Sequence, residues 1–111
     1  MKKVRSLEAL NQLKTTEKGL LILFGGQQCS VCQSIQPKLM ERMTQQYPKM
    51  TLVYVDCHTA PEVCAQNGVM SLPTLQVFFD GGCFIEEVRT FSLQNVLSKI
   101  QRPYQLLFTA T

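Results

Sequence analysis

Residues 20–32 join an unbroken apolar run to two cysteines at the start of a helical pattern. Leu20–Phe24 is apolar at every position, which is typical of a strand buried on both faces of a sheet. Two glycines and two glutamines follow, and then Cys29 and Cys32, with apolar residues at helical spacing beyond them. A second strand is predicted at residues 51–56. This order indicates an α/β fold in which a helix connects two parallel strands.

The two cysteines form a C-x-x-C pair, which is the spacing of a redox-active dithiol. The nucleophile in disulfide exchange is the thiolate, and the free N–H groups and dipole of a helix N-terminus stabilise such an anion. Cys29 is predicted at that position, and Cys32 follows one turn later, within reach of a disulfide bond. We therefore expect Cys29 to be exposed and to attack, and Cys32 to be covered and to resolve the mixed disulfide.

The residues alone leave two other roles open for this pair. A zinc site needs about four ligands, whereas the chain offers one histidine, His58, and no second C-x-x-C. A structural disulfide between residues three apart would close a very short loop and would be unusual in a reducing compartment. Redox chemistry is the interpretation that the sequence favours.

Length and composition predict a single globular domain over residues 1–111, since 45% of the residues are hydrophobic and 17% are charged. The formal net charge is +3, and the short basic start lacks the length and the interleaved aromatic residues of a nucleic-acid surface. No apolar run approaches the ~20 residues of a membrane span, and no signal peptide is recognisable. We expect a cytoplasmic protein that binds neither nucleic acid nor membrane.

Periodicity predicts further helices. One follows Ser6 as its N-cap, and a last one follows Ser92 and is ended or bent by Pro103. The helix after Cys29 contains Pro37, which should kink it. Its expected apolar stripe consists of Val31, Ile35, Leu39, Met43 and Tyr47.

Alternating and β-branched residues predict the strands. A brief edge strand is expected near the N-terminus, and two further strands at 74–79 and 83–88 are joined by the turn residues Asp80–Gly82. A proline at the mouth of a strand is tolerated, as Pro73 would be before residue 74. The pattern is therefore strand and helix in alternation, followed by a hairpin and a final helix.

Three local matches in this order resemble the thioredoxin family. Cys29-Ser30-Val31-Cys32 matches the active-site C-x-x-C, Pro37 matches the kink proline of the following helix, and Leu72-Pro73-Thr74 before Phe78-Phe79-Asp80-Gly81 matches the cis-proline and hairpin. The resemblance covers about residues 5 to 101 and implies a thioredoxin-like fold, with a central mixed four- to five-stranded sheet flanked by helices.

The resemblance also implies an activity. The protein would be a thiol-disulfide oxidoreductase that acts on protein disulfides, with Cys29 as nucleophile and Cys32 as resolving thiol. Pro73 would be cis beside the dithiol, and Leu72, Pro73 and Gln28 would contact substrate. The implied partners are protein disulfides and an upstream reductase, the implied state is a monomer, and no cofactor or metal is implied.

The sequence departs from the family pattern at three positions. Gln28 replaces the usual tryptophan before the first cysteine, Leu23 replaces a buried aspartate that helps move a proton from the resolving thiol, and Leu52 replaces a partner lysine. Proton transfer must then use water or another group. These departures leave open a second hypothesis, a redox-switched adaptor on the same fold. A third hypothesis is a metal carrier that uses Cys29, Cys32 and perhaps Cys57.

The other cysteines are expected to be packed free thiols, because free cysteine is among the most buried residue types. These are Cys57, Cys64 and Cys83. Cys57 follows a predicted strand at the edge where sites form in parallel sheets, so an auxiliary redox thiol or a metal site with His58 and Cys64 remains an alternative. His58 itself is expected to be a solvated loop residue.

Overall fold

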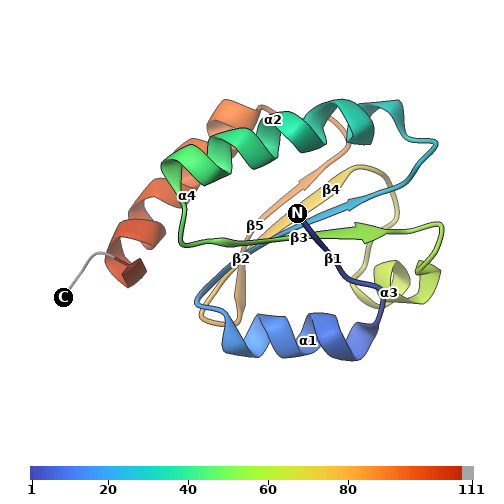
Figure 1. The fold of residues 1–111 in the computed structure, drawn as a ribbon, viewed down its shortest axis with the longest axis horizontal. Helices are drawn as coiled ribbons and strands as arrows, with labels where there is room; N and C mark the ends of the chain where they lie inside the picture. Colours follow the sequence, from blue (N-terminus) through green and yellow to red (C-terminus); the bar gives the residue numbers. More distant parts are fainter. Residues whose placement is uncertain (109–111) are drawn as a thin grey trace.

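The computed structural model describes residues 1–108 and contains a five-stranded mixed sheet with helices on both faces (Figure 1). The elements are β1 (Lys2–Lys3), α1 (Leu7–Thr16), β2 (Gly19–Gly25), α2 (Ser30–Gln46), β3 (Thr51–Asp56), α3 (Pro61–Gln66), β4 (Thr74–Phe79), β5 (Gly82–Val88) and α4 (Leu93–Phe108). The strand order is β1-β3-β2-β4-β5. β1, β3 and β2 are parallel, and β4 runs antiparallel to both β2 and β5. The predicted α/β class and mixed sheet are confirmed.

β2 is the central strand, and every residue in it is buried. Leu21 and Leu23 point into the hydrophobic cluster beneath α2 and α4, whereas Leu20, Ile22 and Phe24 point into the cluster on the α1 and α3 side (Figure 1). The unbroken apolar run in the sequence exists because helices cover both faces of this strand.

Local sequence signals explain several element boundaries. The Ser6 hydroxyl accepts a hydrogen bond from the Ala9 N–H, and the Ser92 hydroxyl accepts one from Asn95, so both predicted caps are confirmed. Asp80 and Gly81 have positive φ values of 50° and 83°. They form a two-residue turn of the kind that fits the twist of a hairpin.

Two details of the helices differ from the prediction. Val31 is 49% exposed, because the inward side of α2 begins one position later, at the fully buried Cys32, and continues through Leu39 and Met43. α4 continues through Pro103 to Phe108 instead of ending there. Tyr104 is buried beyond the proline, and its hydroxyl accepts a hydrogen bond from the Lys49 N–H, so this part of α4 packs against the domain.

Within residues 1–108, no helix has the length and apolar character needed to cross a membrane.

Candidate active site

Three loops meet at the edge of the sheet where the parallel strands end. A Cβ atom placed on Gly26, in the loop between β2 and α2, would lie 2.7 Å from the His58 ring and 3.5 Å from Leu72 Cδ1. His58 belongs to the loop after β3, and Leu72 belongs to the segment before β4. A side chain at position 26 would therefore collide with the neighbouring loop, and glycine allows the close approach.

The two cysteines of the C-x-x-C pair lie at the start of α2 and form a disulfide, with Cα atoms 5.2 Å apart. Cys29 is the N-cap, and its Sγ accepts a hydrogen bond of 3.2 Å from the Cys32 N–H. Cys29 is half-buried, and Cys32 has no exposed surface. A solvent-facing sulfur is thus positioned at the positive end of the helix, with a covered sulfur behind it.

The Leu72–Pro73 peptide bond is cis, as the resemblance implied. Pro73 is buried, and its carbonyl accepts a hydrogen bond of 2.7 Å from the Arg89 N–H, which fixes the segment to the end of β5. Leu72 packs toward Gly26, three residues before Cys29, while Gln28 is exposed in the same loop. The structure therefore brings the predicted substrate-contacting residues to the loops around the dithiol.

Tyr54 is a site residue that the sequence did not reveal. It pairs with Leu23 in the sheet register, and both side chains belong to the cluster beneath α2. A Cβ atom on Gly25 would lie 2.8 Å from the Tyr54 hydroxyl and 3.1 Å from Cys32 Cβ, so both groups border the same small space. Burial, and next the nearby Asp56 carboxylate, raise the pKa of the Tyr54 hydroxyl. The alternation of the strand could have placed Tyr54 on this face, but not its hydroxyl beside Cys32.

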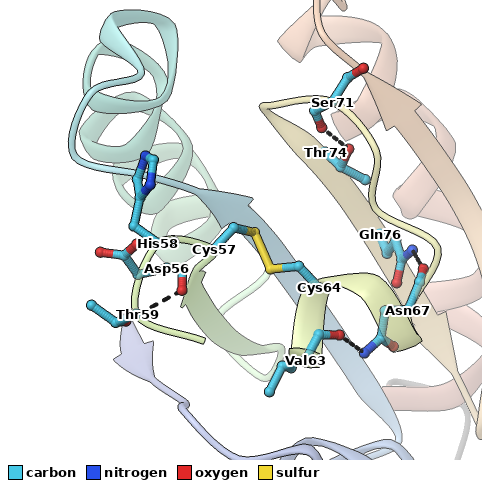
Figure 2. Close-up of a disulfide and its surroundings, with 10 residues drawn as sticks. All are labelled: Asp56, Cys57, His58, Thr59, Val63, Cys64, Asn67, Ser71, Thr74 and Gln76. Carbon is cyan, nitrogen blue, oxygen red and sulfur yellow. Dashed lines mark hydrogen bonds between the residues drawn. A yellow bond between two sulfur atoms is a disulfide. The ribbon is translucent and has the colours of Figure 1, made fainter. Parts of the chain in front are cut away.

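Cys57 and Cys64 form a second disulfide, with Cα atoms 5.8 Å apart (Figure 2). The expectation that they are packed free thiols is wrong, and the alternative of a metal site using them is replaced by this bond. The bond connects the loop after β3 to the middle of α3, where Cys64 is 4% exposed. Residues 58–60 turn back between them, and this turn brings the two sulfurs together (Figure 2).

Cys83 is the free cysteine, and it is exposed, so the expectation of a packed thiol is also wrong there. It lies in β5, the outer strand of the sheet, most of whose residues are exposed. His58 is exposed as expected, and its backbone N–H donates a hydrogen bond of 2.8 Å to Asp56 Oδ1. Among residues 1–108, no group of three or more histidine, cysteine or acidic residues is arranged to hold a metal ion.

Comparison with known proteins identifies the family. The family profile described as Thioredoxin matches residues 3–102. The chain belongs to the thioredoxin family. The chain is 26% identical over 103 residues to the thioredoxin-like protein YdfQ of Bacillus subtilis, covering 93% of this chain and 91% of that protein. It is 28% identical over 100 residues to a thioredoxin of Mycoplasmoides gallisepticum, covering 90% and 98% of the two chains.

A solved structure agrees with this assignment. A thioredoxin mutant from Entamoeba histolytica superposes with a TM-score of 0.78 at 27% identity, covering 91% of this chain and 97% of that one. Membership of the thioredoxin family, with a C-x-x-C pair at disulfide distance, makes this chain a thiol-disulfide oxidoreductase.

Proposed function

We propose that this thioredoxin-family protein exchanges disulfides with protein substrates through Cys29 and Cys32. The observation that carries the proposal is the half-buried Cys29 at the N-cap of α2 with the fully buried Cys32 bonded behind it. In the reduced protein, the Cys29 thiolate attacks a substrate disulfide and releases one substrate thiolate. The Cys32 thiolate then attacks Cys29 Sγ, releases the second substrate thiolate and closes the Cys29–Cys32 disulfide. The substrate gains two electrons.

Substrate binding is assigned to Leu72, Pro73 and Gln28. Within residues 1–108, the backbone N–H and carbonyl of Leu72 have no hydrogen-bond partner, so they are available to an extended substrate chain. Val31, between the two cysteines, is 49% exposed, and Met70, two residues before Leu72, is 95% exposed. Exposed apolar side chains beside open backbone groups suit an unfolded or loop segment of protein as substrate.

Repeated turnover requires a source of electrons. An upstream reductase would return two electrons to the Cys29–Cys32 disulfide after each cycle and so regenerate the dithiol. We therefore place the protein in the cytoplasm, where such reductants keep thiols reduced. We also assign it as a single-domain monomer. Alkylation of intact cells tests the compartment, because a reducing one should keep Cys57 and Cys64 largely as thiols.

Reduction of insulin by dithiothreitol, followed by turbidity, tests the proposed function. The wild type and the control Cys83→Ser should accelerate the reaction equally, whereas Cys29→Ser and Cys32→Ser should not accelerate it. Equal acceleration by all four proteins would reject the dithiol as the reactive site. Retention of a partner by a protein lacking both cysteines, without catalysis in the wild type, would favour the adaptor hypothesis.

A further inference from the structure

The chain has three tyrosines, and their hydroxyls are used differently. The Tyr47 hydroxyl donates a hydrogen bond to the Leu97 carbonyl, and the Tyr104 hydroxyl accepts one from the Lys49 N–H. These two join helices and loops of the core. The Tyr54 hydroxyl, on a side chain only 5% exposed, has no hydrogen-bond partner within residues 1–108. The hydroxyl oxygen is not sealed from solvent, because no buried side-chain nitrogen or oxygen within residues 1–108 lacks a partner. It is therefore free to bind another group.

The position of this hydroxyl relates it to Cys32. The hydroxyl oxygen and Cys32 Cβ border the same space above Gly25, which is open because Gly25 has no side chain. Cys32 Sγ is one bond from that Cβ. Leu23, the residue next to Tyr54 across the sheet, cannot give or take a proton, and Cys32 has no exposed surface of its own. The Tyr54 hydroxyl is thus a polar group close to the resolving cysteine.

The charged groups near Tyr54 belong to three segments. Lys3 on β1 pairs with Tyr54 in the sheet, Arg5 follows β1, and Asp56 follows on β3. A cavity of about 70 Å³ at this edge is lined by Lys3, Val4, Arg5, Gln27, Tyr54, Asp56 and Thr59. The first two turns of α2 and the segment 69–73 carry no charged side chain. His58, beside Gly26, is a further titratable residue at this edge of the sheet. The cavity is large enough for water and connects Tyr54 to the surface.

We propose that the Tyr54 hydroxyl donates a hydrogen bond to the Cys32 thiolate as it forms. This inference rests on the proposed function. In the step concerned, the Cys32 S–H loses its proton to water, the thiolate attacks Cys29 Sγ, and the bond between Cys29 and the substrate sulfur breaks. Tyr54 keeps its own proton throughout and stabilises the anion before it attacks.

The raised pKa of Tyr54 is consistent with this role. Burial and the Asp56 carboxylate both disfavour the phenolate, so the hydroxyl stays protonated and able to donate at the pH where thiols react. Tyr54 is therefore a donor to the thiolate and not a base.

Tyr54→Phe removes the hydroxyl oxygen and nothing else, and Tyr47→Phe is the matched control for losing a buried tyrosine hydroxyl. Both are made with Cys83→Ser, which removes the exposed thiol. Each reduced protein is mixed with one equivalent of Ellman's reagent, quenched with acid at intervals, and mapped by mass spectrometry. Formation of the Cys29 adduct measures attack, and its decay to the Cys29–Cys32 disulfide measures resolution.

We expect Tyr54→Phe to form the Cys29 adduct at the rate of the parent but to resolve it about tenfold more slowly, since a hydrogen bond to a charged group is lost. The pH midpoint of resolution should rise by about one unit, which is the same tenfold change. Tyr47→Phe should change neither quantity. Unchanged decay and midpoint in Tyr54→Phe would overturn the inference alone, whereas absence of a Cys29 adduct in the parent would overturn the proposed function and the inference together.

A second measurement needs no substitution. In the reduced wild type labelled with ¹³C, the Tyr54 Cζ resonance should move with the titration of Cys32, because the two groups share a hydrogen bond. A Tyr54 Cζ chemical shift that does not change as Cys32 titrates would also overturn the inference.

Discussion

Replacing Cys57 by serine opens the second disulfide while leaving the buried Cys64 in place. Cys57 is partly exposed, so the substitution removes little packing. The lost bond spans a sequence separation of 7 residues. The chain-entropy relation for a loop of this length gives a loss of about 2.5 kcal/mol in the free energy of unfolding at 25 °C, because the unfolded chain gains freedom. For a domain of this size, the midpoint of thermal unfolding should fall by about 10 °C.

The assay is urea unfolding followed by circular dichroism without reductant, so that the Cys29–Cys32 disulfide remains intact. Cys83→Ser is the matched control, because it replaces a sulfur that forms no disulfide. Hydrogen exchange adds a local readout. The Cys64 carbonyl accepts hydrogen bonds from the Asn67 and Val69 N–H groups, and these two amides should lose protection first in Cys57→Ser.

The Cys57–Cys64 bond stabilises the fold by constraining the unfolded chain. A loss below about 0.5 kcal/mol in Cys57→Ser would refute that reasoning, since changes of this size are usual for surface substitutions. A loss equal to that in Cys83→Ser would refute it as well.

Three other predictions concern the core, the tyrosines and the free thiol. Leu23→Ala, at a fully buried position, should lower the unfolding free energy by about 2–5 kcal/mol in urea; a loss under about 1 kcal/mol would contradict the packing described. Burial raises the pKa of Tyr47 and Tyr54 from 10.0, so their contribution to stability is complete below pH 10 and is lost as the pH rises through the folded-state values. Absorbance at 295 nm should therefore report tyrosines that ionise later in the folded protein than in urea, and coincident titrations would count against this. Iodoacetamide without reductant should modify Cys83 alone, and an intact mass with more than one adduct would contradict the two disulfides.

Short-range patterns predicted much of the fold. The unbroken apolar run Leu20–Phe24 identified the central strand, because only a strand covered on both faces is apolar throughout. Asp80 and Gly81 identified the hairpin, because both adopt the positive φ that such turns require. The sequence also predicted Cys29 at the N-cap of α2, because that position depends only on the neighbouring strand and helix.

Features that depend on the path of the chain in space could not be predicted from the sequence. The Cys57–Cys64 pair forms only because residues 58–60 turn back toward α3. α4 continues past Pro103 although the proline removes one helix hydrogen bond. Tyr104 and its neighbours pack against the core beyond the proline, and this packing outweighs the lost hydrogen bond. The Tyr54 hydroxyl and Cys32 Cβ border the same space above Gly25 because of the register of β2 with β3 and the missing side chain of Gly25. No pattern along one strand contains that information.

The most direct test is to trap the mixed disulfide that Cys29 forms with a substrate. Reduced Cys32→Ser and Cys29→Ser proteins are each mixed with a disulfide-containing protein and separated on a non-reducing gel. The account predicts that Cys32→Ser accumulates a covalent complex, released by dithiothreitol and mapped to Cys29, and that Cys29→Ser does not. A complex formed by Cys29→Ser instead, or one mapped to Cys57, Cys64 or Cys83 in Cys32→Ser, would contradict it.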